Sequence, residues 1–284
     1  MYPEILQIGP LKIHSYGLCI AIGFLISLYL AQRDAQKRGI NPEIIQTEAI
    51  ITLIIGVLGA RIFHIILFPQ DYSITNPIGW IAFWEGGLVF QGALPFSFAY
   101  VFWAMKRRKI PFLLIADCAV PYLALGQGIG RIGCFLNGCC YGKPAPSLPW
   151  AVRFPAGSIV FQSYPGEGGW SLPVHPTQMY ATIGLIFLFA LLIYIRDVWH
   201  PFTGITIPIY FFLHGVMRFI NEIFRGDHNP TNLGLGVLTD QQIFCLLEVA
   251  VGVFLFFLIK KYSTTSSLQI SQSKDAKSKK RKNR

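Results

Sequence analysis

Three arginines lie within or at the ends of long apolar runs, where a charged side chain is costly. They are Arg61, Arg131 and Arg218, and the first two have small residues nearby in the sequence. A Lys or Arg at the centre of a transmembrane helix costs about 2.5 to 3.5 kcal/mol on insertion scales. Each arginine is therefore a functional candidate unless it reaches the lipid headgroups or pairs with a carboxylate. The carboxylates available for such pairing are Glu48, Glu85, Asp117 and Glu222.

Arg131 and Arg218 are the two arginines most suited to bind a ligand. For Arg61 we favour a structural role, in which the side chain reaches the lipid headgroups or pairs with a carboxylate. Each of the two is followed by an asparagine, Asn137 or Asn221. A guanidinium donates two parallel hydrogen bonds to a phosphate, so two such groups at one membrane level would bind a phosphate firmly. A phosphate within reach of lipid suggests a phospholipid headgroup.

Arg225 follows Arg218 by seven residues, with Glu222 between them. On a continuous helix this spacing places both arginines on roughly the same face, two turns apart. We therefore expect Arg225 to be a further group that contacts the anion.

The histidines and cysteines are less decisive. His14 and His175 each lie in a polar, aromatic cluster at a predicted membrane boundary, which suits catalysis, an interfacial belt or the start of a helix at Thr177 equally well. Three of the six cysteines are clustered at positions 134, 139 and 140. They could form a disulfide from Cys134 to either neighbour, or bind a metal that lacks an evident fourth ligand. Free packing thiols are the explanation we favour, and we expect no metal site.

The elements that position these residues are apolar helices. Of the 284 residues 53% are hydrophobic and 13% charged, whereas a soluble domain is roughly 25% charged. The apolar residues form continuous runs of about 17 to 25, long enough to cross a bilayer as helices, and they do not alternate as in a barrel. We predict an all-α polytopic membrane protein with seven transmembrane helices and a small extracytoplasmic lobe. The predicted spans are 16–31, 47–67, 88–105, 112–135, 178–195, 204–223 and 241–259.

The distribution of basic residues predicts the orientation. Under a seven-span arrangement seventeen Lys and Arg residues fall on one side, which should be the cytoplasm. The N-terminus is then expected outside, with no cleaved signal peptide, and the C-terminus in the cytoplasm. We predict a membrane domain over 1–261, an outer lobe over about 136–175 and a disordered basic tail over 262–284. The tail accounts for much of the net charge of +10, so nucleic acid is not an expected partner.

Six motifs together resemble the bacterial prolipoprotein diacylglyceryl transferases. They occur in order over nearly the whole chain, which makes the set far more specific than any one motif. The motifs are His14-Ser15-Tyr16-Gly17, Trp84-Glu85-Gly86-Gly87-Leu88, the segment from Gly130 to Gly142 (GRIGCFLNGCCYG), His175-Pro176-Thr177-Gln178-Met179-Tyr180, the segment from Arg218 to Arg225 (RFINEIFR), and Leu238-Thr239-Asp240-Gln241.

The resemblance implies a multi-pass enzyme of the bacterial cytoplasmic membrane that acts in lipoprotein biosynthesis. Such an enzyme transfers the diacylglyceryl group of phosphatidylglycerol to the lipobox cysteine of a prolipoprotein, forming a thioether and releasing glycerol 1-phosphate without a cofactor. It also implies a role for each matching residue. Arg131 would bind phosphatidylglycerol and Arg218 would be the second essential arginine. Supporting or substrate-binding roles would fall to Tyr16, Asn137, Gly142, Gln178, Tyr180 and Arg225.

The sequence departs from the family pattern at several positions. Gln91 stands where many members have a histidine proposed to accept the thiol proton, and a glutamine does not serve as a base. Gln91 remains a candidate substrate contact, and His14 and His214 become the candidate bases. Cys134, Cys139 and Ala181 replace residues that are often Asn, Glu and Glu in the family.

Other functions remain open from the sequence. A transporter or flippase also carries charges inside the membrane, but it predicts repeated halves with broken helices, which the sequence lacks. A headgroup transferase with another acceptor and a non-catalytic lipid-binding protein are the two further alternatives.

Overall fold

The computed structural model describes residues 4–8, 11–72, 78–81, 87–227 and 238–282. Within these ranges the side chains of 4–8, 11–13, 78, 81, 90–91 and 263–282 are not described. The chain divides into two units, one made of residues 1–27 and 116–284 and the other of residues 28–115.

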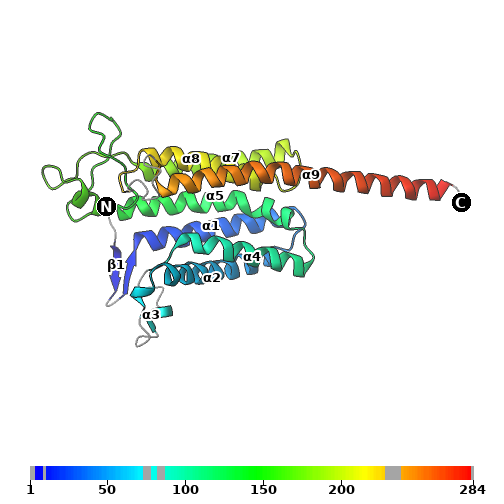
Figure 1. Ribbon diagram of the computed structural model, residues 1–284, viewed down its shortest axis with the longest axis horizontal. Coiled ribbons are helices and arrows are strands. Elements are labelled where there is room, and N and C mark those ends of the chain that lie inside the picture. The colour runs from blue at the N-terminus through cyan, green and yellow to red at the C-terminus, as the bar shows by residue number, and fades with distance from the viewer. Residues whose placement is uncertain (1–3, 9–10, 73–77, 82–86, 228–237, 283–284) are drawn as a thin grey trace. The chain divides into compact units, whose positions relative to one another are not determined.

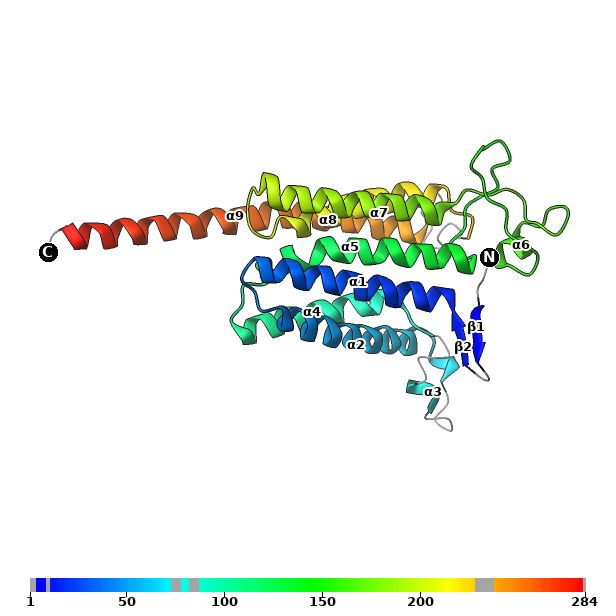
Figure 2. The ribbon, with the colours of Figure 1, turned by 180° about the vertical axis from the view of Figure 1, so that it is seen from behind.

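The first unit is a group of long helices preceded by a β-hairpin. The hairpin pairs β1 (Glu4–Ile8) with β2 (Leu11–His14) in antiparallel register, an element that the sequence did not predict. The ribbons of α5, α7, α8 and α9 run side by side in Figures 1 and 2. The helices of this unit are α1 (Ser15–Lys37, of which residues 15–27 belong here), α5 (Phe112–Asn137, from residue 116), α6 (Ile159–Ser163), α7 (Thr177–Tyr194), η3 (Ile195–Trp199), α8 (Thr206–Ile223) and α9 (Asp240–Lys282).

The second unit is built on an antiparallel helix pair, α2 (Pro42–Leu67) and α4 (Phe90–Arg108), joined by η1 (Pro69–Asp71) and α3 (Ile78–Ile81). Arg61 donates hydrogen bonds to the carbonyl oxygens of Trp80, Gly87 and Gly79 at 3.2, 3.0 and 2.5 Å. These bonds tie the connecting segment to α2. The side chain of Arg61 is therefore engaged by backbone carbonyl oxygens of the connecting segment, which is in keeping with a structural role.

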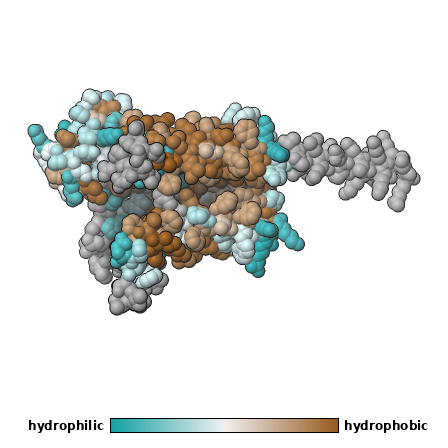
Figure 3. All heavy atoms as spheres, viewed as in Figure 1, coloured by the Kyte–Doolittle hydropathy of each residue, from teal (hydrophilic) through white to brown (hydrophobic). Residues whose placement is uncertain are grey.

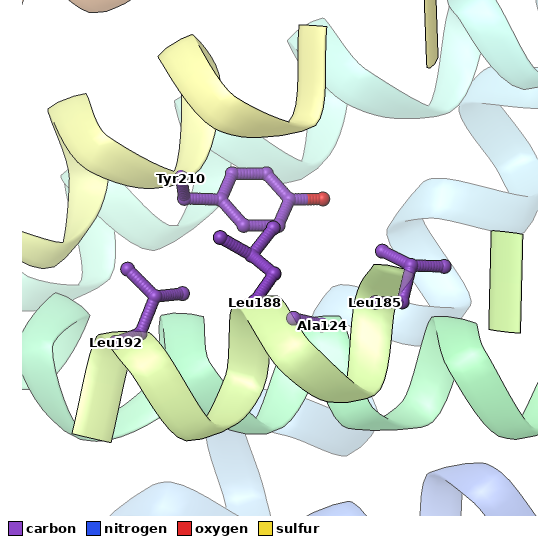
Figure 4. Close-up of a cluster of buried hydrophobic side chains, with 5 residues drawn as sticks. All are labelled: Ala124, Leu185, Leu188, Leu192 and Tyr210. Carbon is purple, nitrogen blue, oxygen red and sulfur yellow. The ribbon is translucent and has the colours of Figure 1, made fainter. Parts of the chain in front are cut away.

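A hydrophobic cluster fastens α5, α7 and α8 together. Leu188 and Leu192 of α7 are fully buried and pack with Leu185, with Ala124 of α5 and with Tyr210 of α8 (Figure 4). Burying one such leucine contributes about 1.5 to 3 kcal/mol relative to leaving it exposed. The cluster fixes the three helices whose ends carry the candidate site residues.

A helix lies at each of the seven predicted spans, and five of these helices are long and apolar enough to cross a membrane: α1, α2, α5, α7 with η3, and α9 as far as Tyr262. The helices α4 and α8 lie outside this group because their polar residues lower the mean hydropathy. Hydrophobic side chains cover the visible faces of the helices, with hydrophilic ones toward their ends (Figure 3). The protein is thus a polytopic helical membrane protein.

The segment between α5 and α7 folds on a small core of its own. Tyr141, Phe154, Val160 and Val174 are buried together, and isolated backbone bridges such as Val152 to Val174 connect parts of the segment. The predicted lobe over about 136–175 falls on this segment, and both its bounds and the side of the membrane on which it lies stay predictions. The backbone of α9 continues to Lys282, while the disordered state of the tail over 262–284 likewise stays a prediction.

Candidate active site

A cavity of about 290 Å³ lies between α5, α7 and α8, and both predicted arginines line it. Arg131 comes from the penultimate turn of α5 and Arg218 from the last turns of α8. Two apolar lining residues, Ile220 and Phe224, are 51% and 37% exposed, so the cavity borders an apolar surface. The lining residues are Arg131, Tyr180, Ala181, Gly184, Leu185, His214, Met217, Arg218, Ile220, Asn221 and Phe224.

Glycines allow the helices to approach closely around this cavity. A Cβ at Gly128 would lie 3.4 Å from Leu185 Cβ, and Thr182 Oγ1 donates a hydrogen bond of 3.2 Å to the Gly128 carbonyl. The α5 and α7 backbones are therefore nearly in contact one turn before Arg131. At Gly184, where the side chain of Met217 occupies the space a Cβ would need, α7 and α8 meet in the same way.

Both arginines have donor groups that the protein does not use. Among the described residues, Arg131 forms no hydrogen bond or salt bridge, and Nη1 of Arg218 is buried without a hydrogen-bond partner. Nη2 of Arg218 lies 3.1 Å from a carboxylate oxygen of Glu222. The positive charges of Arg131 and Arg218 are close enough to interact. Unpaired donors and two like charges beside apolar walls make the cavity suited to an anion.

The expectation that Arg225 shares a helix face with Arg218 is wrong. The helix α8 ends at Ile223, and Arg225 lies beyond it in an isolated bridge to Gly142. Nε and Nη2 of Arg225 donate to the carboxylate of Asp227 at 2.8 and 2.6 Å. Burial lowers the pKa of Arg225, but the hydrogen bonds to Asp227 and the nearby negative charges outweigh it and raise the pKa. Arg225 is therefore a charged group that is largely engaged within the protein.

His214, four residues before Arg218 in the sequence, also lines the cavity. A carboxylate contacts the imidazole ring of His214. Its Nδ1 lies 2.8 Å from Oε1 of Glu248 on α9, and its ring stacks on Tyr210 at 5.2 Å between centroids. The next residue, Gly215, permits this approach because a Cβ there would lie 2.9 Å from the Cys245 carbonyl oxygen. A histidine oriented by a carboxylate is the usual arrangement of a general base.

The motif around Gly142 joins three separate segments beside the cavity. The Gly142 N–H donates to the His175 carbonyl at 3.1 Å, and the Lys143 N–H donates to the Phe224 carbonyl at 2.8 Å. A Cβ at Gly142 would lie 2.5 Å from both Cβ and O of His175, so only glycine fits. His175 Nδ1 lies 3.2 Å from the hydroxyl of Tyr180, which lines the cavity.

The other predicted site residues are not part of the cavity lining. Tyr16 is 42% exposed in the first turn of α1, and His14 is exposed just before it. Tyr16 nevertheless lies against the last turns of α5, because a Cβ at Gly133 would be 3.2 Å from its Cα. Asn137 ends α5, and Gln178 is buried with its amide donating to the Cys139 carbonyl at 2.8 Å. The Gln91 side chain lies outside the described side chains.

The thiols of all six cysteines are free. Cys134, Cys139 and Cys140 lie together at the end of α5. Hydrogen bonds from Cys134 and Cys139 lower the pKa of the Cys140 thiol, burial opposes this, and the charges of Arg225 and Arg131 lower it further. The pKa of the Cys140 thiol therefore lies below its ordinary value.

Sequence reasoning missed Glu248 and the apolar part of the cavity wall. Glu248 is a carboxylate inside the predicted span 241–259, and by the criterion applied to the arginines it should have been singled out. Met217, Leu185 and Phe224 carry no such signal, because apolar residues in an apolar helix cannot be assigned to a cavity without the helix packing.

Comparison with known proteins shows the family of this chain. A family model described as prolipoprotein diacylglyceryl transferase matches residues 3–258. A phosphatidylglycerol–prolipoprotein diacylglyceryl transferase of Clostridium tetani is 34% identical over 262 residues, which cover 90% of this chain and 97% of that protein. Proteins of the same name from Serratia proteamaculans and Geobacter sulfurreducens are 28% and 29% identical, covering 95% and 91% of this chain and 96% and 95% of their own lengths. The chain belongs to the prolipoprotein diacylglyceryl transferase family.

Proposed function

We propose that this transferase moves the diacylglyceryl group of phosphatidylglycerol to the lipobox cysteine thiol of a prolipoprotein. A carbon–sulfur bond forms, the bond between the glyceryl carbon and the phosphate oxygen breaks, and glycerol 1-phosphate leaves with that electron pair. The observation that carries the proposal is the pair of arginines, Arg131 and Arg218, with unused donors on one apolar cavity.

The cavity wall supports a lipid as the source of the phosphate. Most of the lining residues are apolar, and Ile220 and Phe224 are exposed beside the opening. A soluble phosphate ester would leave these side chains in water, whereas acyl chains would cover them. The arginines would then bind the phosphodiester and hold the leaving phosphate as its charge grows, and only the second effect accelerates the reaction.

We infer that His214 accepts the proton of the acceptor thiol, because the thiolate is the attacking nucleophile. Its contact with Glu248 fixes the ring, and it lines the same cavity as the two arginines. His14 is the alternative base, and its exposed position at the end of β2 supports it less well.

The remaining motif residues have positioning or substrate-binding roles in this proposal. Gly142 and Gln178 hold the backbone around the cavity, and Tyr180 contributes its hydroxyl to the wall. Tyr16 and Asn137 lie at the same end of the first unit. Arg225 would orient the turn at Gly142, and Gln91 would contact substrate.

We further propose seven membrane crossings in the bacterial cytoplasmic membrane, with α4 and α8 completing the set. Each carries polar residues that a neighbouring helix or the cavity engages: Tyr100 of α4 donates to Glu48 of α2, and Arg218 of α8 lines the cavity. The N-terminus and the lobe over 136–175 would then lie outside and the basic tail in the cytoplasm, in agreement with the distribution of Lys and Arg. The reaction as proposed needs no soluble cofactor and no nucleic acid.

The test is a transfer assay with the purified protein in vesicles. We expect lipidation of a synthetic lipobox peptide in vesicles of phosphatidylglycerol, with equal release of glycerol 1-phosphate. Vesicles of phosphatidylcholine and a peptide with serine in place of the cysteine are the controls, and neither should react. A folded protein that moves lipid between leaflets without modifying the peptide would contradict the proposal.

A further inference from the structure

The cysteine cluster at the end of α5 has the geometry of a metal site. The Sγ atoms of Cys134, Cys139 and Cys140 all lie within 4.8 Å of one another. Cys134 is buried, and the other two are half-buried. The cluster is therefore closed on one side and reachable on the other.

The backbone bends sharply to bring these three side chains together. After the last turn of α5 the Cys139 N–H donates to the Cys134 carbonyl at 3.1 Å, and Gly138 and Cys140 adopt left-handed conformations with φ of 73° and 59°. A residue other than glycine adopts that conformation only at a cost in free energy. Such strain persists only where surrounding contacts enforce it.

Two side chains from α7 enforce the bend. Thr177 Oγ1 donates to the Cys140 carbonyl at 2.7 Å, and Gln178 Nε2 donates to the Cys139 carbonyl at 2.8 Å. Both residues are almost completely buried. The turn that presents the cysteines is thus fixed by a neighbouring helix, so the three sulfurs stay near one another without a ligand.

The dimensions and charge suit a thiophilic cation. A zinc ion binds thiolates at about 2.3 Å, which in a tetrahedral site separates the sulfurs by about 3.8 Å. Small side-chain rotations would bring the observed sulfurs to that spacing. Three thiolates and one divalent cation leave a charge of −1, and the positive charges of Arg131 and Arg225 already act on Cys140. Hard cations such as Mg²⁺ and Ca²⁺ require oxygen ligands instead.

We propose that Cys134, Cys139 and Cys140 bind one zinc ion through three thiolates and leave its fourth coordination position open to an exogenous thiol. The open position follows from the exposed side of the cluster at Cys139 and Cys140. A three-ligand zinc site with one exchangeable position is the usual form of reactive zinc sites. This proposal replaces the sequence-based expectation of free packing thiols without a metal.

The lipobox cysteine is one thiol that could occupy the open position, and this identification rests on the proposed function. Binding would place the acceptor sulfur on the metal near Arg131, and the thiol proton would pass to the base, for which His214 is proposed. The zinc site itself depends only on the cysteine geometry. The tests below use no turnover, so they succeed or fail separately from the transferase assay.

The first measurement is the metal content of the full-length protein purified under argon without chelators. We expect one zinc per chain in the wild type. Each of Cys134→Ser, Cys139→Ser and Cys140→Ser should bind zinc more weakly by on the order of 100-fold or more, since loss even of an outer partner of a ligand costs 10- to 100-fold. Cys19→Ser is the matched control, because Cys19 is a free thiol of α1 outside the cluster, and it should bind zinc as the wild type does.

The second measurement does not depend on any variant folding. Cobalt(II) added to the wild-type protein should give thiolate-to-metal absorption and the intense visible bands of a four-coordinate site. The visible bands should shift with a lipobox peptide that carries cysteine and stay unchanged with the serine peptide.

Three outcomes would overturn the proposal. One is a wild-type protein without zinc and without the cobalt spectrum, and another is a disulfide within the cluster in the anaerobically purified protein. The third, a cobalt spectrum unaffected by the cysteine peptide, would remove the open position.

Discussion

At the scale of single residues, the central feature is a pair of arginines without sufficient partners. Arg131 has no hydrogen bond or salt bridge among the described residues, and Arg218 has one unpaired buried nitrogen. Arg61, in contrast, donates to three backbone carbonyls. The sequence analysis favoured Arg131 and Arg218 as ligand-binding groups because each has an asparagine nearby, and it favoured a structural role for Arg61. Unused donors in an apolar wall destabilise the empty protein, and a bound anion would remove that penalty.

Replacement of Arg131 by alanine should lower kcat/KM for phosphatidylglycerol on the order of 10²- to 10³-fold, because one charged donor to the leaving phosphate is lost. Arg131→Lys should fall between the wild type and Arg131→Ala, since lysine keeps the charge and loses the two parallel bonds. Arg153→Ala, at an exposed position of the lobe, is the control and should match the wild type. Steady-state lipidation kinetics measure these effects. Equal rates for Arg131→Ala and Arg153→Ala would refute the assigned role.

His214 and Glu248 should behave as one unit. Each single alanine substitution should lower kcat, and the double variant should be no slower than His214→Ala, because Glu248 acts only through the ring that it orients. Lipidation rates of the wild type, both single variants and the double variant provide the comparison. If the fold decrease in kcat of the double variant equalled the product of the two single decreases, Glu248 would act separately from His214.

At the scale of secondary-structure elements, close helix approaches decide which side chains meet. Gly215 lets α8 approach α9, so that His214 reaches Glu248, which lies 34 residues further along the chain. The sequence showed the glycines and the helices but not which glycine faces which helix. The wrong expectation for Arg225 has a similar reason, because its bridge to Gly142 joins segments far apart in the sequence and cannot be predicted from the local residues.

Gly142→Ala should destabilise the protein by about 1 to 3 kcal/mol, since the new methyl group would overlap His175. Gly17→Ala is a matched substitution in the first turns of α1, where a Cβ would meet nothing within 4 Å. It should be neutral or slightly stabilising, as alanine is the better helix former. Unfolding of both variants in detergent gives the comparison, and equal stability of the two would contradict the tight packing inferred at Gly142.

Asp117→Ala should also destabilise the protein by about 1 to 3 kcal/mol, because buried donors lose their acceptor. Its carboxylate accepts bonds from the Gly204 N–H at 2.6 Å and from the Thr206 N–H and hydroxyl at 3.2 and 2.8 Å, which anchors the start of α8. Asp71→Ala, at an exposed position of η1, is the control for the same unfolding measurement and should have little effect. If Asp117→Ala lowered the free energy of unfolding no more than Asp71→Ala does, the start of α8 would not depend on these hydrogen bonds.

At the scale of the whole molecule, the apolar runs predicted the positions of the helices well. Each predicted span coincides with a helix, because a continuous apolar run has no other way to satisfy its backbone in lipid. The hairpin of β1 and β2 escaped prediction, since its short strands give only a weak pattern. The cavity escaped as well, because its wall combines side chains from three helices.

The proposed orientation can be checked with reporter fusions. Alkaline phosphatase fused after Ser147, in the lobe, should be active, whereas fusions after Ile110 or after Tyr262 should be inactive. The reason is that the enzyme folds only outside the cytoplasm, where its disulfides form. An active fusion after Tyr262 would contradict an odd number of crossings with the C-terminus in the cytoplasm.

The most direct test of the central claim is an experimental structure of the protein with phosphatidylglycerol bound. We predict that the phosphate lies within hydrogen-bond distance of both Arg131 and Arg218, with the acyl chains along Ile220 and Phe224. A phosphate bound elsewhere, with the cavity between α5, α7 and α8 empty of lipid, would contradict the account.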